Sequence, residues 1–260
     1  MPSLHSTELM LYKYTITKER FDEAKSQLLL AGFAEDDAKK LIIRKSSANS
    51  VSSVLNYCDK LLQPPFNLTK KQIIKIAANA GGGKNILAFF SAFQDLKCNS
   101  LNTEQIVHIA GNIGGSKAIQ AVLHSFKELK DIGFNTEQIV HIAGNNGGSK
   151  AIQAVLHSFK EFKDIGFNTE QIVHIAGNGG GSKTIQTVLH SFKELKGIGF
   201  NTEQIVRLAG NIGGSKAIQT VLHSFKELKD IGFSTEQIVR IAGNTGGSKA
   251  IKTQLTSSQS

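Results

Sequence analysis

The sequence predicts an all-α protein, a solenoid of two-helix repeats with a degenerate-repeat cap at its N-terminus, and three observations support this. A unit of 33 residues recurs along most of the chain. Within each unit, apolar residues recur at the three- and four-residue steps of one helical face. Each unit also contains an Asn-x-Gly-Gly segment, which is typical of a turn between two helices. The chain of 260 residues is 40% hydrophobic, enough to bury a continuous apolar interior.

The repeats occupy residues 68–260, and a different region precedes them. Five complete units are followed by a partial one: 68–100, 101–133, 134–166, 167–199, 200–232 and 233–260. Residues 1–67 lack the Gly-Gly turn, but their segment VLNYCDKLLQPPF resembles VLHSFKELKDIGF of the repeats. Because the terminal units of a solenoid need a cap, we expect residues 1–67 to form an N-terminal cap of degenerate helical repeats.

The unit 134–166 shows which helices to expect. Asn135 and Gln138 have the spacing of a capping box, which predicts the start of a short first helix. A longer second helix follows the turn, because apolar residues continue on one face there: Ile152, Val155, Leu156, Phe159 and Phe162. Gly166 has the position of a glycine that ends a helix, so we expect the second helix to stop there.

One position of the turn varies while its neighbours stay constant. The units 101–133 and 134–166 differ at three positions, and the difference in the turn replaces Ile113 by Asn146. The residues at this position are Ala80, Ile113, Asn146, Gly179, Ile212 and Thr245. An asparagine precedes each of them: Asn79, Asn112, Asn145, Asn178, Asn211 and Asn244. Packing does not call for such exchanges, so we expect the variable residue to contact a ligand and the asparagine to hold the turn by local hydrogen bonds.

Two glycines and a lysine follow each variable residue. The glycine pairs are Gly81 and Gly82, Gly114 and Gly115, Gly147 and Gly148, Gly180 and Gly181, Gly213 and Gly214, and Gly246 and Gly247. The lysines are Lys84, Lys117, Lys150, Lys183, Lys216 and Lys249. A lysine at a helix N-terminus opposes the helix dipole, and a bound phosphate would satisfy both the lysine and the exposed backbone N–H groups. We therefore predict phosphate contacts at these residues, although a solvated lysine would also tolerate the position.

Composition and motifs exclude several classes of protein. The net charge of +9 and the pI near 9.5 favour an acidic partner, which includes nucleic acid, acidic proteins and membrane surfaces. Cys58 and Cys98 have no ligand spacing, so we expect no metal site and no cofactor. Catalytic motifs such as HExxH and the nucleophile elbow are absent from the sequence, so we expect no enzyme and no small-molecule substrate. The N-terminus resembles no secretory signal, and we expect an intracellular protein without a membrane segment.

A family resemblance rests on the turn motif. The strings AGNIGGSK, AGNNGGSK and AGNGGGSK, each after EQIV, resemble the repeats of transcription activator-like (TAL) effectors over residues 68–260. In composition the chain is most similar to the small TAL-like proteins of bacterial endosymbionts and uncultured microbes. The resemblance implies a right-handed superhelix that follows the major groove of double-stranded DNA, with one repeat for each base of one strand. It also implies that the variable residue touches the base and that the asparagine before it stabilises the loop.

The resemblance assigns bases to some repeats. Ile113 and Ile212 imply adenine, Asn146 implies guanine or adenine, and Gly179 implies thymine, which gives the core 5′-N-A-G-T-A-N-3′. The bases for Ala80 and Thr245 stay open. Hydrogen-bond chemistry agrees in direction, because an amide donates to purine N7 and a glycine leaves room for the thymine methyl group.

Some residues depart from the family pattern. The turn continues as GGSK here and usually as GGKQ in the family, so the phosphate contact of Lys117 and its equivalents is our inference. N-terminal units of the family supply nonspecific DNA affinity, and Arg44 and Lys45 occupy the corresponding loop of this chain. We therefore expect these two residues to contact phosphate also, or else to be ordinary surface charges.

The sequence therefore predicts a monomeric protein that binds double-stranded DNA in a sequence-specific manner. We expect a transcriptional regulator or an architectural protein, in bacterial cytoplasm or nucleoid or, if translocated, in a host nucleus. One alternative is a helical-repeat scaffold that binds proteins, since ankyrin units are also 33 residues long, but their T-P-L-H signature is absent. Another is a reader of single-stranded RNA, a class that uses two or three side chains for each base.

Overall fold

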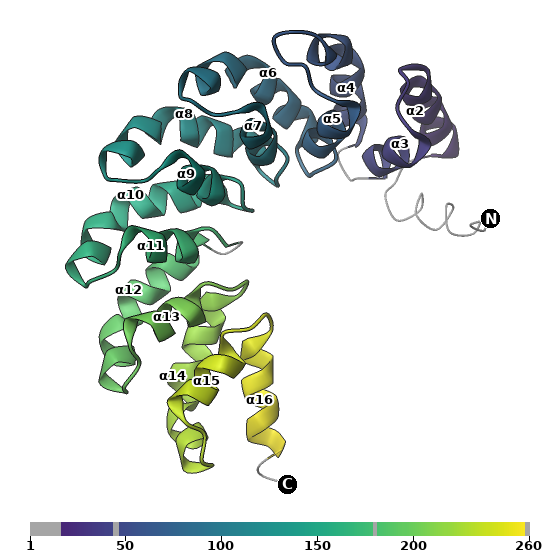
Figure 1. Ribbon diagram of the computed structural model, residues 1–260. Helices are drawn as coiled ribbons and strands as arrows, with labels where there is room; N and C mark the ends of the chain where they lie inside the picture. Colours follow the sequence, from purple (N-terminus) through teal and green to yellow (C-terminus); the bar gives the residue numbers. More distant parts are fainter. Residues whose placement is uncertain (1–16, 44–46, 179–180, 258–260) are drawn as a thin grey trace. The chain divides into compact units, whose positions relative to one another are not determined.

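The computed structural model describes residues 17–43, 47–178 and 181–257, and within these ranges it contains fifteen helices and no strand (Figure 1). The prediction of an all-α protein is therefore confirmed. The contacts define two compact units, Met1–Leu123 and His124–Ser260. No helix in the described ranges is long and apolar enough to cross a membrane.

The first unit begins with three helices that precede the repeats: α2 (Lys18–Leu30), α3 (Glu35–Ile42) and α4 (Ser47–Leu62). α3 and α4 are a short helix followed by a longer one, the same order as in the repeats. α4 packs on α5 and α6 of the first repeat, so no gap in the packing separates this region from residue 68 onward. At the start of α3, Glu35 is paired with Lys25 (2.7 Å) and Lys39 (2.9 Å), and hydrogen bonds from both lysines lower the pKa of its carboxyl group to about 2.

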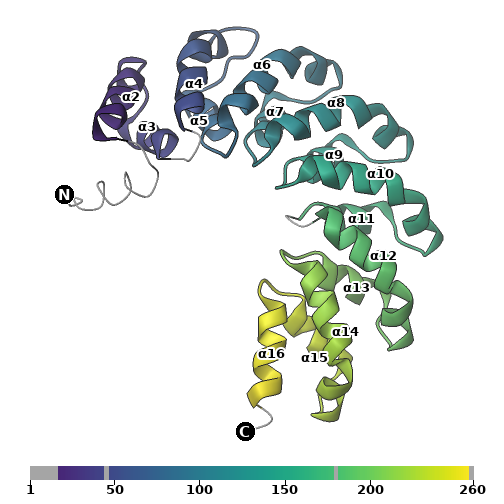
Figure 2. The ribbon, with the colours of Figure 1, turned by 180° about the vertical axis from the view of Figure 1, so that it is seen from behind.

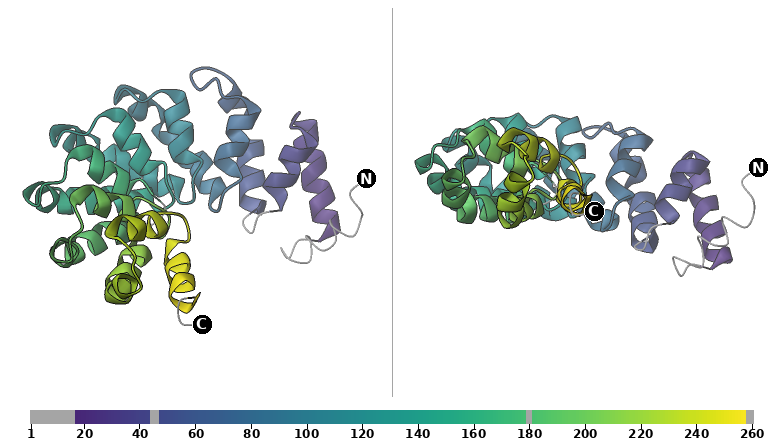
Figure 3. Two further views of the ribbon diagram at one scale, coloured as in Figure 1. Left: turned by 60° about the horizontal axis from the view of Figure 1, so that its bottom comes forward. Right: turned by 90° about the horizontal axis from the view of Figure 1, so that it is seen from below.

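The repeats alternate a short and a long helix. The short helices each have eight residues: α5 (Lys70–Ala77), α7 (Thr103–Ala110), α9 (Thr136–Ala143), α11 (Thr169–Ala176), α13 (Thr202–Ala209) and α15 (Thr235–Ala242). The long helices are α6 (Gly82–Cys98), α8 (Gly115–Asp131), α10 (Gly148–Asp164), α12 (Gly181–Gly197), α14 (Gly214–Asp230) and α16 (Gly247–Ser257). In the second unit α10, α12, α14 and α16 pack against one another in sequence order (Figures 2 and 3). Repeated helix pairs thus pack in succession.

Each short helix begins at a capping box, as the sequence predicts. The backbone N–H of Gln138 donates to the side chain of Asn135 at 2.8 Å, and the backbone N–H of Asn135 donates to the side chain of Gln138 at 2.9 Å. The same reciprocal pair is present at the start of all six short helices, where Thr69 or Ser234 replaces asparagine in the first and last. Two backbone donors that a helix would otherwise leave unpaired are thereby satisfied in each repeat.

Four long helices, α8, α10, α12 and α14, are followed by a glycine in the left-handed region, whereas Ser100 has this conformation after α6. Gly166 has a φ of +91°, and its N–H donates to the carbonyl of Lys163 at 3.0 Å. The next residue, Phe167, donates to the carbonyl of Phe162 at 2.9 Å, which completes a Schellman motif. The predicted end of the second helix at Gly166 is therefore confirmed.

The core lies between the two layers of helices. Ile152, Val155 and Phe162 are fully buried, whereas Leu156 and Phe159 are half-buried. Phe134, Phe167 and Phe200, which open later units, are also buried, whereas Phe233 is partly exposed. Phe167 makes an edge contact with Phe162, with ring centroids 5.1 Å apart. Because each phenylalanine packs against the helix before it, the apolar face of one repeat is covered by the next.

Candidate nucleic-acid interface

The segment between the two helices of a repeat is a tight turn that presents the variable residue. The N–H of Gly115 donates to the carbonyl of Asn112 at 2.9 Å, and the equivalent bond is present in all six repeats at 2.8 to 2.9 Å. The first glycine of the pair lies in the left-handed region, with φ +82° and ψ 15° at Gly147. These are the angles of the third residue of a type II turn, where glycine is favoured. The variable residue is therefore the second residue of the turn.

The second glycine of each pair permits a close approach between the two helices. A Cβ atom on Gly115 would lie 2.2 Å from the carbonyl oxygen of Ala110, which is far inside van der Waals contact. The equivalent distances at the other repeats are 1.8 to 2.1 Å, always to the carbonyl oxygen of the alanine that ends the short helix. The two glycines therefore have different roles, one conformational and one steric.

The asparagine before the variable residue ties the turn to the short helix. Its side-chain amide donates to the carbonyl of the residue four positions earlier, as in Asn112 to His108 at 2.6 Å and Asn244 to Arg240 at 2.8 Å. Asn178 differs slightly and donates to Ile175 at 2.8 Å. These bonds satisfy carbonyl groups that the end of the helix leaves free, and they restrict the orientation of the turn.

In three repeats the same asparagine also contacts the following repeat, which sequence reasoning missed. Within the first unit the Asn79 amide donates to the carbonyl of Gly111. Within the second unit Asn178 donates to the carbonyl of Ala209 at 3.1 Å, and Asn211 donates to the carbonyl of Gly243. In these repeats the turn is thus hydrogen-bonded to the end of the next short helix, which restricts its position relative to the following repeat.

The variable residues point away from the protein. Ile113 is 50% exposed and Ile212 is 70% exposed, although both are large apolar side chains. Ala80, Asn146 and Thr245 are exposed too. In the described part of the chain, the side chains of Asn146 and Thr245 form no hydrogen bond with the protein. Gly179 lies outside the described residues. A residue at this position therefore contributes little to the fold, and its side chain is available to a ligand.

A row of lysines accompanies the turns. All six, Lys84, Lys117, Lys150, Lys183, Lys216 and Lys249, are exposed and lie in the first turn of a long helix. Among the described residues, none of these lysines belongs to an ion pair. The N–H of the second glycine already donates within the turn. We therefore expect an anion to be bound here by the lysine ammonium group and not by the N–H of the second glycine.

Four residues predicted to contact a ligand cannot be placed. Arg44 and Lys45 of the cap, and Gly179 and Gly180 of the fourth complete repeat, lie outside the described residues. The neighbouring Gly181 and Lys183 are described, and they follow the pattern of the other repeats: Gly181 is buried against Ala176, and Lys183 is exposed.

The eighth residue of several repeats lies against the glycine that follows the next short helix. The residues at the eighth position are Lys75, His108, His141, His174, Arg207 and Arg240, and all are exposed. A Cβ atom on Gly177 would lie 2.3 Å from the ring of His141, and one on Gly210 would lie 2.0 Å from the ring of His174. The φ of Gly177 is an ordinary value of −78°, so the close approach of the ring, and not the backbone conformation, favours glycine there.

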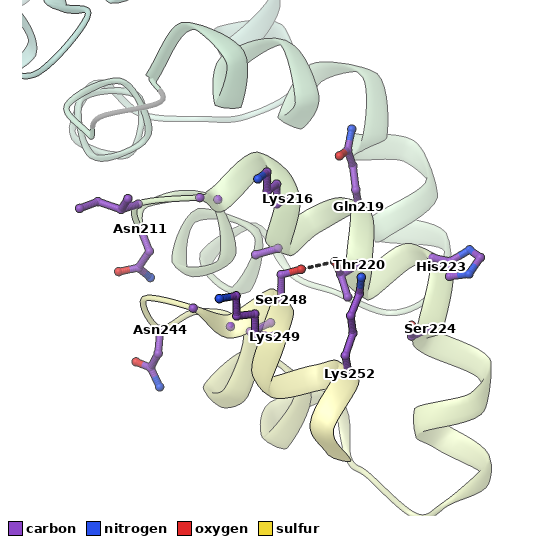
Figure 4. Close-up of a pocket in the computed structure, with 17 residues that line it drawn as sticks. Asn211, Lys216, Gln219, Thr220, His223, Ser224, Asn244, Ser248, Lys249 and Lys252 are labelled. Atoms are coloured by element: carbon purple, nitrogen blue, oxygen red, sulfur yellow. Dashed lines mark hydrogen bonds between the residues drawn. The ribbon is translucent and has the colours of Figure 1, made fainter. Parts of the chain in front are cut away.

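A groove lies between the turns of the last two repeats, inside the second unit (Figure 4). It has a volume of about 670 Å³ and is lined by residues of α14, α16 and their preceding turns. Lys216, Lys249 and Lys252 line it, and none of the described residues that line it is acidic. At one side the hydroxyl groups of Thr220 and Ser248 are hydrogen-bonded at 2.7 Å. An open groove with three cations is suited to an extended polyanion.

Metal chemistry finds no support in the side-chain arrangement. In the described ranges, no group of three or more histidine, cysteine or acidic side chains is placed to hold a metal ion. No protein-family model matches the chain, and a comparison with curated proteins finds no relative of significant similarity.

Proposed function

We propose that this chain binds double-stranded DNA in the major groove and reads its sequence with one repeat for each base, as in the TAL effector-like proteins that its repeats resemble. The observation that carries the proposal is the turn: an exposed residue of changing identity on a rigid support, beside an unpaired lysine, in successive repeats. Reading of this kind requires the 33-residue units to wind as a right-handed superhelix around the duplex, and we propose that geometry too.

Each variable side chain suits contact with one base edge. Asn146 offers an amide that donates to N7 of guanine or adenine, while Ile113 and Ile212 offer only apolar contact. Gly179 leaves space for the methyl group of thymine. The bond of each asparagine to the short helix keeps the turn from shifting, so the position of a side chain against its base is set before binding. The implied core is 5′-N-A-G-T-A-N-3′.

The lysine row would supply affinity that does not depend on sequence. Six lysine contacts to phosphates predict a slope of about −5 for the logarithm of the binding constant against the logarithm of the salt concentration. Each base that is read well adds roughly 1–3 kcal/mol of discrimination. Six bases recur about every 4,000 base pairs of random sequence, so we propose a regulator or architectural protein of modest specificity.

The other parts of the proposal follow from this one. The chain acts as a monomer without a cofactor and catalyses no reaction, because its repeated turns present exposed single residues and do not gather a cluster of reactive groups. Its place of action is where the DNA is, in a bacterial cytoplasm or nucleoid or, after translocation, in a host nucleus.

The repeats 101–133 and 134–166 provide the test, because in the turn they differ only at Ile113 and Asn146. Fluorescence anisotropy would measure binding of a labelled TAAGTAA duplex at two salt concentrations. We expect Ile113→Asn to move the preferred base at its position from adenine towards guanine. Asn146→Ile should do the reverse at the next base, each by roughly 1–3 kcal/mol.

The outcomes separate the hypotheses. A change of preference confined to the base opposite the altered repeat supports reading by single residues. Equal, salt-sensitive binding of every duplex by the wild type would leave only a nonspecific DNA binder. Absence of binding even at low salt would contradict the proposal and favour a scaffold that binds protein. Gly179→Asn, which should weaken binding to the thymine duplex, provides an independent check.

A further inference from the structure

The groove between the last two repeats contains one cation more than the repeat pattern explains. Lys216 and Lys249 belong to the lysine row that accompanies the turns. Lys252 does not, because this position is apolar or an amide in the earlier units: Leu87, Gln120, Gln153, Gln186 and Gln219. Only the last repeat therefore has a second lysine three residues after the lysine of the turn.

Lys249 and Lys252 lie on one face of α16. Residues three positions apart are neighbours on a helix surface, and both side chains line the groove. Figure 4 shows Lys252 extended along the groove towards Thr220, whereas Lys216 and Lys249 lie at the end near the turns. The two ammonium groups of α16 are thus directed at different parts of the same groove.

The charges in the groove are not balanced by the protein. Among the described residues that line it there is no carboxylate, and the other polar groups are amides, hydroxyls and the imidazole of His223. Three like charges in one groove repel each other, which is unfavourable unless an anion binds between them. Thr220 and Ser248 are hydrogen-bonded to each other at 2.7 Å and carry no charge that would balance the lysines.

We propose that Lys252 binds a second backbone phosphate of the DNA, next to the phosphate that Lys249 contacts. Lys249 and Lys252 are separated by about 4.5 Å along the helix axis, at 1.5 Å for each residue. Successive nucleotides of one strand are separated by about 3.4 Å along the duplex, so two long side chains reach two successive phosphates. This inference rests on the proposed DNA binding. It adds that the last repeat contacts one more phosphate than each of the other repeats and so binds the duplex more strongly.

The experiment replaces Lys252 by the residue that four other repeats carry. Lys252→Gln should fold as the wild type does and should lower the magnitude of the salt slope by about one. Affinity should fall equally for all duplex sequences, with the preferred bases unchanged. The control is Lys229→Gln, which removes the same charge from an exposed site in the last turn of α14, outside the groove, and we expect it to leave the slope as it is.

A scan with neutral phosphates locates the contact. Each phosphate of the duplex in turn is replaced by a methylphosphonate, and binding of the wild type is compared with that of the Lys252→Gln and Lys249→Gln variants. We expect one phosphate whose neutralisation weakens the wild type but not Lys252→Gln. It should be adjacent to the phosphate that no longer matters in Lys249→Gln.

Several results would overturn the inference. An unchanged slope in Lys252→Gln would show that Lys252 contacts no phosphate, and an equal change in Lys229→Gln would show that only the total charge matters. Calorimetric binding of inorganic phosphate that is lost in Lys252→Gln, with DNA binding unaffected, would assign the groove to a small anion. These results leave the proposed function intact, whereas a wild type that binds no duplex at all would contradict both proposals.

Discussion

Different polar groups form the hydrogen bonds between successive long helices in the two units. We call this contact between neighbouring long helices the seam. In the first unit Asn85 is fully buried; its amide donates to the carbonyl of Asn112 at 3.3 Å and its oxygen accepts from the N–H of Ser116 at 2.9 Å. In the second unit a hydroxyl pair joins the long helices three residues further along, Thr187 with Ser215 at 2.8 Å. Thr220 and Ser248 repeat it one unit later. The hydrogen bonds of the seam are therefore made by an amide in the first unit and by pairs of hydroxyl groups in the second unit.

The comparison separates two kinds of variation among the repeats. Asn85 stands where the other units have alanine or threonine, and it has partners inside the protein that account for it. The residues at Ile113 and Ile212 also change from unit to unit, but their side chains are exposed. Variation at the seam is thus explained by the fold, whereas variation in the turn calls for a partner outside it.

The largest expected effect on stability is at the second glycine of the turn, which is present in all six repeats. Gly214→Ala would place a Cβ atom 2.1 Å from the carbonyl oxygen of Ala209, and because both helices are packed, the backbone has to move. We expect a loss of about 3 kcal/mol in the free energy of unfolding. Urea unfolding followed by circular dichroism measures it.

The adjacent glycine is the control for this prediction. Gly213 has a φ of +92°, and no atom lies within 4 Å of a Cβ built on it. Gly213→Ala should therefore cost only the strain of the left-handed conformation, about 1–2 kcal/mol. Equal losses of unfolding free energy for the two variants would show that the close approach of the helices is not the reason why the second position requires glycine.

The next effect is at the seam of the first unit. Asn85→Ala removes a buried amide and leaves the N–H of Ser116 and the carbonyl of Asn112 without this partner. Buried polar groups that lose a hydrogen bond cost about 1–3 kcal/mol, and we expect about 2 kcal/mol in urea unfolding. Ser116→Ala retains the backbone N–H and should cost less than 1 kcal/mol, about that of a surface substitution. A larger loss for Ser116→Ala would contradict this account of the seam.

The seam of the second unit should be less sensitive. Thr220→Ala removes one half-exposed hydroxyl bond, for which we expect about 0.5–1.5 kcal/mol. Thr220→Ser keeps the hydroxyl and serves as the control. Unit 134–166 already has Ala154 at the equivalent position, so the fold tolerates the loss. If Thr220→Ala cost as much as Asn85→Ala, the two seams would be equivalent in energy, and the difference between them would be one of residue type alone.

Local signals in the sequence predict much of this structure, and contacts between repeats escape them. The capping box at Asn135 and the end of the helix at Gly166 depend on residues within one turn of helix, so their spacing is enough to predict them. The bond from Asn79 to the carbonyl of Gly111 joins residues of different repeats. A sequence says that such an amide needs a partner, but only the packing of the helices decides which carbonyl comes within reach.

The candidate site shows the same division. The exposed variable residue and the lysine beside it are visible in the sequence, because six copies with one changing position stand out. The two roles within each glycine pair are not, since the steric role of Gly214 depends on how closely Ala209 approaches. Lys252 is visible as an exception to the repeat, but its place in the groove with Lys216 depends on the packing of α16 against α14.

The smallest expected effect on stability is at the turn itself. Ile212 is 70% exposed, so Ile212→Asn should change the free energy of unfolding by no more than about 0.5 kcal/mol, as for other surface substitutions. The same variant should alter which duplex is bound most tightly, by roughly 1–3 kcal/mol at one base. Urea unfolding and anisotropy on one protein preparation measure both quantities.

A residue that reads a base should change the base preference much more than the free energy of unfolding. A residue of the seam between long helices should do the reverse. Thr220→Ala should shift stability while the preferred base stays the same, and Ile212→Asn should do the opposite. A destabilisation by Ile212→Asn of more than about 1 kcal/mol would mean that the turn depends on the side chain it presents. Position-by-position exchange of the variable residue would then alter the support as well as the contact, and reading by independent repeats would fail on physical grounds.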